Sequence, residues 1–421
     1  MIFIADLHIH SYLSRACSPR LRPERLHEWC QLKGVSVLAT GDFTHPAWFS
    51  ELQEKLVPAE PGLFALKPEL ARRVDADVPA SCRAPVRFVL EVEISCIYKK
   101  NGKVRKVHHL VYAPSFDAAS RINARLGKIG NIRSDGRPIL GLDSRDLLEL
   151  VLDSSEEAHL VPAHAWTPHF AVFGSESGFD SIEECFEDLT PRIFAVETGL
   201  SSDPPMNWRV SGLDCVALIS NSDAHSPEKI AREANVFDTD LSYRGIFEAI
   251  RANDHSRFIK TIEFFPEEGK YHADGHRKCG VLLSSKETLR RKGLCPVCGS
   301  PVTVGVLHRV EKLADRKNGF KPAGVPGFER VVPLKEVLGQ TLRVGPASVK
   351  VEAQYRRLLS LFGSELGILR ETPLDRLDAE GFPLLALALR RMRAGTARLQ
   401  PGYDGEYGVV SLLGEKDFKP S

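Results

Sequence analysis

Residues 1–11, MIFIADLHIHS, decide how the rest of the chain is interpreted. Residues 2–5 form an apolar run of strand length, and Asp6, His8 and His10 follow it directly. Two imidazoles and a carboxylate at the end of a first strand need partners from elsewhere in the fold. We therefore look for other predicted strands that end in the same kinds of residue.

The first 265 residues alternate between apolar runs of strand length and amphipathic stretches of helix length. Strands that are apolar on both faces and alternate with helices are typical of a mostly parallel sheet. About seven such units favour a closed β/α barrel over an open sheet. Segments 51–86 and 99–142 interrupt the alternation as insertions, and Asn101-Gly102 predicts a hairpin turn. The apolar runs are IFIADLH, VSVLATGD, RFVLEVEIS, VHHLVYAP, HLVPAHA, IFAVETG and VALISNSDAH.

The sequence changes character near residue 270. Residues 271–305 are rich in Cys, Gly and His, and residues 306–345 carry basic residues and a Pro- and Gly-containing loop. Later stretches have apolar residues at three- and four-residue steps, which is typical of helices. We expect an α/β barrel over 1–268, a small Cys-rich domain with basic loops over 269–345, and a helical C-terminal region over 346–421.

Imidazole and carboxylate side chains stand at nearly every predicted strand end. The carboxyl ends of the strands of a β/α barrel form one rim, so these side chains are expected to converge on one pocket. Such a donor set suits Zn, Mn or Fe, and bridging carboxylates allow two or three ions to lie close together. His108 and His109 point to opposite faces of a strand, so we expect only one of them in the pocket. Glu197 fits the pocket and the orientation of a helix equally well. The candidates are His8, His10, Asp42, His45, Glu93, His108, His109, His164, Glu197, Asp223 and His225.

Two further ligand pairs lie beyond the predicted barrel, His276-x-x-Cys279 and Cys295-x-x-Cys298, each followed by glycine. Pairs with two intervening residues are typical of a zinc knuckle. His272 is an alternative to His276 in the first pair. Four protein ligands close the coordination shell, so this zinc is predicted to be structural rather than catalytic.

Charge is distributed unevenly along the chain. The formal net charge is +1, so no general affinity for polyanions is expected. Residues 290–345 nevertheless contain eleven Lys or Arg against four Asp or Glu, a local surplus of seven. Basic loops of this kind neutralise nucleic-acid phosphates. The candidates for contacts with a DNA backbone are Arg290, Arg291, Lys292 and Arg309.

The apolar runs are all too short to span a membrane, and the N-terminus lacks the layout of a signal peptide. Most of the nine cysteines lie in apolar segments and are expected to be buried thiols in a reducing compartment. We therefore expect a cytoplasmic protein without a membrane partner.

Several motifs resemble the PHP phosphoesterase family: DLHIHS, the E-x-S strand, HLVY, PAHA and NSDAHS. The resemblance implies a distorted seven-unit β/α barrel with two or three divalent metals (Zn, Mn, Mg or Fe). The family's T-D-H-N motif has His directly after Asp, whereas Phe43 stands there in this chain. His45 is the candidate replacement. Asp223, His164 and Glu93 are candidates for positioning the attacking water, and the residues do not decide which one acts as the base. The implied metal ligands are His8, His10, Asp42, Glu93, His109, His164, Asp223 and His225.

Other stretches narrow the resemblance to the endonuclease Q branch of that family. They are GDFTHP, KVHHLVYAP, HAWTPHFAVFGSESGFDSIEECF, VETGLSSDPPMNWR, CPVCG, VGVLHRVEKLADR and PGYDGEYG. The resemblance implies a DNA repair enzyme that nicks DNA on the 5′ side of deaminated bases, such as uracil and hypoxanthine, and of abasic sites. Damaged DNA and other repair or replication proteins are the expected partners.

A lesion base has to be unstacked into a pocket before it can be sensed. The candidate pocket residues follow two ligand-bearing strands and are Trp166, Phe170, Ser201, Ser202, Asn207 and Trp208. Two alternative functions stay open. A phosphatase for a small phosphomonoester would not need the Cys-rich and basic regions. A nucleic-acid-binding protein with an inactive barrel would be expected to have lost ligands that this chain retains.

Overall fold

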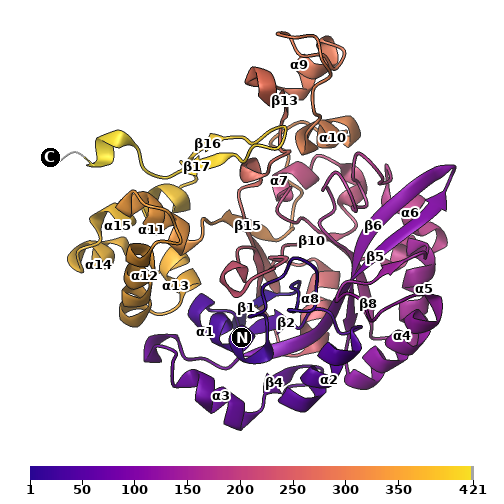
Figure 1. Ribbon diagram of the computed structural model, residues 1–421, viewed down its shortest axis with the longest axis horizontal. Helices are drawn as coiled ribbons and strands as arrows, with labels where there is room; N and C mark the ends of the chain where they lie inside the picture. Colours follow the sequence, from indigo (N-terminus) through magenta and orange to yellow (C-terminus); the bar gives the residue numbers. More distant parts are fainter. Residues whose placement is uncertain (419–421) are drawn as a thin grey trace.

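A mixed sheet forms the centre of the structure, a computed structural model that describes residues 1–418. The sheet has eleven strands, with a main path in the order β15-β12-β11-β1-β2-β5-β4-β3. β6 and β7 pair with β5, β8 pairs with β6, and β9 and β10 form a separate pair. Helices surround these strands in the first two-thirds of the chain, and a second group of helices lies beside them (Figure 1).

The strands are β1 (Ile2–Asp6), β2 (Val37–Ala39), β3 (Leu56–Pro58), β4 (Phe64–Leu66), β5 (Arg87–Lys100), β6 (Lys103–Ala113), β7 (Ile139–Leu140), β8 (His159–Pro162), β9 (Ala195–Glu197), β10 (Ala217–Ile219), β11 (Ala234–Asp238), β12 (Phe258–Glu263), β13 (Asp274–His276), β14 (Val281–Leu283), β15 (Gly327–Arg330), β16 (Arg398–Gln400) and β17 (Val409–Ser411). The helices are α1 (Pro23–Lys33), α2 (Pro46–Lys55), α3 (Pro68–Asp75), α4 (Phe116–Ile129), α5 (Ser144–Ser154), α6 (Ile182–Phe186), α7 (Pro204–Asn207), α8 (Tyr243–Ala252), α9 (Ser285–Arg290), α10 (Val306–Leu313), α11 (Leu334–Leu342), α12 (Val349–Phe362), α13 (Glu365–Arg370), α14 (Leu374–Ala379) and α15 (Pro383–Arg393).

The predicted α/β class and the helical C-terminal region are confirmed, but the sheet is less parallel than predicted. β1–β2, β2–β5 and β12–β15 are parallel, whereas β1–β11, β5–β6 and β6–β8 are antiparallel. The long β5–β6 hairpin accounts for much of the difference, because its strands do not need a crossover helix. Its turn lies at Asn101-Gly102, which both have positive φ, as the Asn-Gly dipeptide predicted.

The central strands of this sheet and the polar segments that follow two of them are buried. β1, β2 and β5 are buried along most of their length, because other elements cover both of their faces. The segments that directly follow β1 and β2 are buried as well. Side chains at these strand ends are therefore held inside the protein and not on open loops.

The helices α11–α15 form a second packed unit against the first. Glu365 at the start of α13 accepts from buried Lys33 at the end of α1 at 2.8 Å, and from the hydroxyl of Tyr355 at 2.9 Å. A buried, fully paired contact of this kind fixes the relative position of two elements. No helix within residues 1–418 combines the length and apolar character needed to cross a membrane.

The Cys-rich region projects away from both units (Figure 1). The hairpin of β13 and β14 and the short helix α9 surround a core of only Leu283, Cys295 and Val302. The neighbouring segments return to the main body: β15 pairs with β12, and α11 packs with α12 and α15. The region between 269 and 345 is thus shared among three parts of the fold.

Candidate metal centre

His8, His10 and Asp223 form the first group of converging donors. The segment after β1 runs beside the segment after β10, with Ile9 and Ala224 paired as a parallel bridge. This pairing brings His10 Nε2 to 3.1 Å and His8 Nε2 to 3.6 Å from Asp223 Oδ1. Both imidazoles are fully buried, whereas the side chain of Asp223 is 27% exposed. The group is therefore open on the side of Asp223.

Glu93, His108 and His164 form the second group. Glu93 Oε1 lies 2.6 Å from His108 Nδ1 and 2.9 Å from His164 Nε2. The other oxygen, Oε2, lies 3.3 Å from His10 Nε2 and 3.9 Å from His8 Nε2. The buried carboxylate of Glu93 is thus shared by the two groups.

The expectation that His109 faces the pocket is wrong, and His108 takes that position. In the β5–β6 register Glu93 is paired with Leu110, so the side chain of His108 lies on the same face as Glu93. His109 points to the other face, where its Nε2 is 2.8 Å from Ser144 Oγ and its ring packs on Phe186. Strand alternation excluded one of the two histidines, but only the register with β5 identifies which.

The donors of the first group fit a divalent cation. His8 Nε2, His10 Nε2 and Asp223 Oδ1 are buried atoms without a hydrogen-bond partner within residues 1–418, although they lie close together. Buried polar atoms are normally paired, so three unpaired ligand atoms that converge are suited to hold a cation. Although burial opposes it, Glu197 and Asp223 raise the pKa of His8 to about 10. The surrounding carboxylates thus favour positive charge at this point, which protons or a metal can supply.

Glu197 supports His8 from behind. Its Oε1 is 3.1 Å from His8 Nδ1 and accepts from Asn221 Nδ2 at 2.8 Å, while Oε2 accepts from the backbone N–H of His164 at 2.8 Å. A carboxylate that accepts from Nδ1–H leaves Nε2 free to bind a metal. The sequence left the role of Glu197 open, and Asn221 went unnoticed because an amide within ISNSDAH carries no ligand signal by itself.

Asp42 takes the equivalent position behind His10, contrary to its prediction as a direct ligand. Its carboxylate is occupied by His10 Nδ1 at 3.1 Å, by the N–H and hydroxyl of Ser11 at 2.7 and 2.6 Å, and by the hydroxyl of Ser14 at 2.9 Å. The structure therefore does not place Asp42 among the converging donors. His45 lies outside both groups too, because its Nδ1 accepts from Ala47 N and caps α2.

His225 lies at the edge of the first group. Its ring centroid is 4.7 Å from that of His10, and its Nδ1 is 2.9 Å from the carbonyl oxygen of Asp223 and 3.5 Å from Asp223 Oδ1. Its side chain is 34% exposed. The structure thus brings His225 beside the donors and not between them.

Three of these residues have left-handed backbone conformations: φ is 53° at Asp42, 29° at His164 and 46° at Asp223. This region is unfavourable for residues other than glycine and is concentrated at functional sites, where the surrounding structure enforces it. Glycines make room for two of the three. A side chain at Gly136 would overlap Asp42, and one at Gly199 would overlap His164.

Four ligand atoms of the Cys-rich region lie within 4.8 Å of one another, those of His276, Cys279, Cys295 and Cys298. His276 Nδ1 is 3.5 Å from Cys298 Sγ. Hydrogen bonds from Ser300 lower the pKa of Cys298 to about 6, which favours the thiolate that binds zinc. His272, the alternative ligand, is buried elsewhere and is not a member of this group.

The predicted base pocket is divided by the structure. Trp166 Nε1 donates to Asn207 Oδ1, Asn207 Nδ2 donates to Ser202 Oγ, and Ser202 donates to the carbonyl of Thr198. These three candidates are buried and hydrogen-bonded to one another, so they hold the loop after β9. Of the three, Asn207 also lines a pocket, but the described lining of that pocket contains none of the candidate metal ligands. This part of the prediction is corrected, because loop composition does not reveal which polar groups are already paired.

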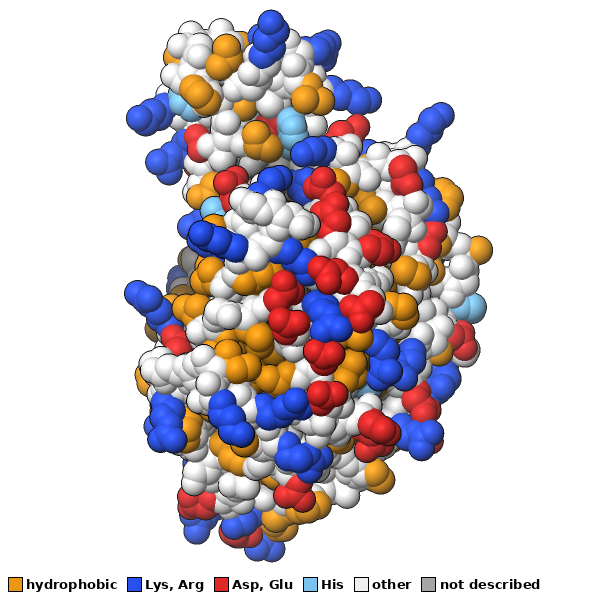
Figure 2. Space-filling view, turned by 90° about the vertical axis from the view of Figure 1, so that its right-hand side faces the viewer, with side chains coloured by type: hydrophobic (Ala, Val, Ile, Leu, Met, Phe, Trp, Pro, Cys, Tyr) orange, Lys and Arg blue, Asp and Glu red, His pale blue; other side chains and the backbone are white. Residues whose placement is uncertain are grey.

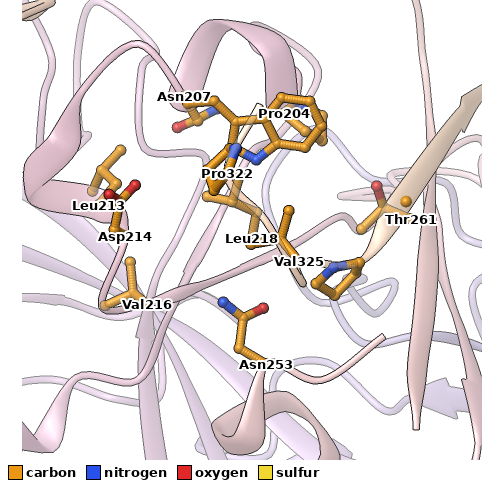
Figure 3. A pocket seen from close by; sticks show the side chains of 13 residues that line it. Pro204, Asn207, Leu213, Asp214, Val216, Leu218, Asn253, Thr261, Pro322 and Val325 are labelled. Carbon is orange, nitrogen blue, oxygen red and sulfur yellow. The ribbon is translucent and has the colours of Figure 1, made fainter. Parts of the chain in front are cut away.

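Phe170, Ser201 and Trp208 have other surroundings. Phe170 is partly exposed and packs on His108 with ring centroids 4.7 Å apart, and Ser201 is partly exposed as well. Trp208 lines a separate pocket between the segments 204–218 and 322–327 (Figure 3). The described lining of that pocket includes none of the candidate metal ligands. Phe170 is thus the aromatic candidate that adjoins the donors.

The candidates for DNA contacts also separate. Arg290, Arg291 and Lys292 are exposed on the projecting Cys-rich region, where Figure 2 shows Lys and Arg side chains around the upper end of the molecule. Arg309, in contrast, is buried and donates to the carbonyls of Phe173 and Phe179 and to Asp180. Its predicted contact with DNA is wrong, because the guanidinium holds α10 against the main body.

Arg137 was not predicted from the sequence. It lies on the loop between α4 and β7, and its Nη1 is 2.9 Å from Glu93 Oε2. An arginine in the sequence SDGRP carries no signal of its own, and a separation of 44 residues hides the contact.

The sequence of this chain is similar to one described family and to two known proteins. Residues 333–396 match the family described as the MJ0043 C-terminal domain. The protein MJ0043 of Methanocaldococcus jannaschii is 31% identical over 258 residues, which are 60% of this chain but only 32% of that protein. This chain thus spans about a third of MJ0043. The protein YqxK of Bacillus subtilis is 29% identical, covering 96% of this chain and 98% of its own length.

Two solved structures are similar over the whole chain. One is the lesion-specific endonuclease PfuEndoQ of Pyrococcus furiosus, with a TM-score of 0.86 and 28% identity. The other is endonuclease Q in complex with a 27-mer duplex substrate that has an abasic lesion at the active site, with a TM-score of 0.84 and 29% identity. Both matches cover 100% of this chain and 98% of the other. The resemblance inferred from the motifs is therefore confirmed, and the chain has the fold of endonuclease Q from end to end.

Proposed function

We propose that the protein is a metal-dependent DNA repair endonuclease that hydrolyses a phosphodiester bond beside a damaged nucleotide. The observation that carries the proposal is the carboxylate of Glu93, shared by two buried groups of metal-binding donors. The full-length likeness to a lesion-specific endonuclease supports DNA as the substrate, since one such structure is in complex with an abasic duplex. A buried donor set of this kind has no use in a protein that only binds DNA.

The residues present fit two metal ions. His8, His10 and Asp223 would hold one, and His108, His164 and the shared Glu93 a second. Bound divalent ions neutralise charge on a phosphate and lower the pKa of water. Glu197 and Asp42 keep the Nδ1 atoms of His8 and His10 occupied, so both Nε2 atoms point inward.

Asp223 is the proposed water-positioning residue. Its side chain is partly exposed, whereas Glu93 is completely buried, so Asp223 is the carboxylate that a water molecule and the substrate can reach. Although burial opposes it, the close neighbours His8 and His10 lower the pKa of its carboxyl below the ordinary range. An ionised acceptor at the open side of the centre can orient a water for attack. His164, held by Glu93 and Thr167, is then a ligand of the second ion and not the water-positioning residue.

The proposed lesions are abasic sites and the deaminated bases uracil and hypoxanthine, with cleavage on the 5′ side. The breadth of this range is inferred from the sequence motifs. Phe170 supports it, because its ring adjoins His108 and offers an apolar wall for an unstacked nucleotide. Ser201 is the polar candidate on the neighbouring loop.

The projecting region is the part of the protein that is proposed to bind the phosphate backbone of the duplex. One zinc ion held by His276, Cys279, Cys295 and Cys298 would fix its fold, and Arg290, Arg291 and Lys292 would contact phosphates. Such contacts are independent of base sequence and weaken with salt.

The test is a nicking assay on a labelled duplex that contains one abasic site or one uracil, with an undamaged duplex of the same sequence beside it. We expect a single product cut on the 5′ side of the lesion, no cut in the undamaged duplex, and loss of activity in EDTA. Equal cutting of both duplexes, or hydrolysis of phosphomonoesters only, would contradict the proposal.

Asp223→Asn provides the matched loss of function. The variant keeps the size of the side chain and removes its charge, so nicking should fall at least about a hundredfold while the lesion duplex is still bound. Asp153→Asn, an exposed aspartate on α5, is the control and should nick like the wild type.

A further inference from the structure

Arg137 stands at the entrance to the candidate metal centre. Its Nη1 donates to Glu93 Oε2 at 2.9 Å, the carboxylate oxygen that faces His8 and His10. Its side chain is 28% exposed, whereas that of Glu93 is completely buried. The guanidinium thus has one end at the donors and the other at solvent.

The loop holds Arg137 in place. Asp135 Oδ1 accepts from the backbone N–H groups of Arg15 and Arg137 at 3.3 and 3.0 Å. Gly136 N donates to the carbonyl of Leu13 at 3.1 Å, and Gly136 packs so tightly against Asp42 that a side chain would not fit. The backbone from which the guanidinium extends is therefore anchored to the same segments that carry His10 and Asp42.

The hydrogen bond to Glu93 leaves other N–H donors of the Arg137 guanidinium available. Within the described residues, the guanidinium of Arg137 makes one hydrogen bond, the one to Glu93. None of its other nitrogen atoms is both buried and without a hydrogen-bond partner. Arg232, which also lies near the centre, is different, because it donates to the carbonyls of Ser222 and Asp223. An arginine guanidinium is protonated at every pH at which the protein is folded, so Arg137 stays charged.

Glu93 has too many partners to need an arginine as its counter-ion. His108 and His164 lie at one oxygen and His10 at the other. Cations bound by these donors would compete with the guanidinium for the same oxygen and repel it. A charged group with free N–H donors, fixed at the mouth of the centre, then meets the next anion to arrive.

We propose that Arg137 is a substrate-contacting residue whose guanidinium donates to a non-bridging oxygen of the phosphodiester that is cleaved. The proposal rests on the proposed function and deepens it. Guanidinium groups match the geometry of phosphate oxygens and remain charged at all relevant pH values. A contact that strengthens as charge develops on those oxygens lowers the barrier to cleavage.

The test compares Arg137→Gln with Arg133→Gln. Arg133 lies on the same loop, is exposed, and its side chain makes no ion pair or hydrogen bond with any described residue. Each variant removes one positive charge. At saturating enzyme and metal, single-turnover nicking should fall by roughly a hundredfold in Arg137→Gln and stay unchanged in Arg133→Gln. Metal content and Tm should be the same in all three proteins.

Sulfur substitution identifies the contact. Two diastereomeric duplexes carry a phosphorothioate at the cleaved position. For one of them, the ratio of the oxygen rate to the sulfur rate should be about tenfold larger in the wild type than in Arg137→Gln, because the variant no longer contacts that atom. Equal ratios in both proteins for both diastereomers would overturn the proposal, as would metal loss in Arg137→Gln, which would make Arg137 a positioning residue for Glu93.

Failure of the proposed function is distinguishable. If the wild type nicks no lesion duplex, the same variants are compared on bis(p-nitrophenyl) phosphate, a phosphodiester without a base. A selective loss in Arg137→Gln there supports the phosphate contact without a DNA substrate. Equal hydrolysis by both variants overturns it.

Discussion

Individual residues of the centre depend on glycines that the ligand pattern does not reveal. Asp42 and His164 both have positive φ, and each packs directly against a glycine, Gly136 and Gly199 respectively. Neither glycine is a donor, and Gly136 lies 94 residues from Asp42 in the sequence. The exact positions of Asp42 and His164 thus depend on two glycines whose only contribution is that they have no side chain.

Gly136→Ala tests this dependence. The new methyl group would overlap Asp42 Oδ2 and Ser14 Oγ, so either the loop or Asp42 has to shift. We expect a loss of roughly 1–3 kcal/mol in the free energy of unfolding, together with weaker metal binding because His10 loses its fixed acceptor. Urea unfolding and elemental analysis measure the two effects.

Gly141→Ala is the matched control. This glycine lies just after β7, between β7 and α5, and nothing lies within 4 Å of the position of an added methyl group. Its stability and metal content should equal those of the wild type. If Gly136→Ala behaves like this control, the close approach of the loop to Asp42 is not required.

At the scale of elements, local patterns predicted seven strands (β1, β2, β5, β6, β8, β9 and β10) and the hairpin turn, but not β11, β12 or β15 of the same sheet. The pairing of the strands, which local patterns do not give, decided the site. The alternation of β6 shows that only one of His108 and His109 can face Glu93, but the sequence contains no information on the register of β5 with β6. The antiparallel return of this hairpin is also one reason why the sheet is less parallel than expected. Local composition cannot distinguish a long hairpin from two strands joined by a crossover.

The register of β6 predicts opposite effects for its two histidines. His108→Asn should reduce metal content, because it removes a donor beside Glu93. His109→Asn should retain the metal and instead lower stability, since the ring of His109 is buried against Phe186 and Ser144. Elemental analysis and Tm of the two variants separate these effects. Metal loss in His109→Asn alone would mean that the register is different in solution.

The outer face of β8 contains a histidine with a predictable effect of pH. His159 stacks on Tyr243 with ring centroids 5.6 Å apart and lies 4.5 Å from Phe247. Burial lowers its pKa to about 3. The ordinary pKa of histidine is about 6.5. Below that pH the unfolded chain therefore binds a proton that the folded protein does not accept, so stability decreases as the pH decreases.

His159→Phe should remove this contribution. The wild type loses about 1.4 kcal/mol per pH unit from this group between pH 6.5 and about 3, and keeps the full contribution above pH 6.5. The variant should thus gain stability relative to the wild type by roughly 2 kcal/mol between pH 7.5 and pH 5. Urea unfolding at the two pH values gives the difference. A constant gap between the two proteins would show that the pKa of His159 is the same in the folded and the unfolded protein, which would contradict the prediction.

At the scale of the whole molecule, the sequence was most informative where the signal is local. Two ligand pairs with fixed spacing predicted the candidate zinc site, and its four ligand atoms lie together. Contacts over long separations were missed or misassigned. Arg309 lies in a basic stretch and was therefore predicted to contact DNA, yet it packs against segments about 130 residues away in the chain. A basic residue in a loop region becomes a structural residue when another part of the fold supplies its acceptors.

The projecting Cys-rich region has too small a core to fold without its metal. Leu283, Cys295 and Val302 are its buried core, and Leu289 and Val297 are exposed. So little buried apolar surface cannot offset the entropy of ordering some thirty residues. The zinc ion proposed for this region would then be the main source of its folding free energy.

Cys295→Ser should therefore unfold the projecting region and leave the rest intact. We expect one zinc fewer per chain, rapid proteolysis between residues 271 and 305, and unchanged metal at the centre that contains Glu93. Binding to damaged and undamaged duplexes should weaken by a similar factor, because Arg290, Arg291 and Lys292 lose their fixed positions. Cys215→Ser, an exposed cysteine outside the group, is the control and should change none of these quantities. A variant that lacks one zinc but resists proteolysis and binds DNA normally would mean that the region folds on its own and that the basic cluster is not a DNA contact.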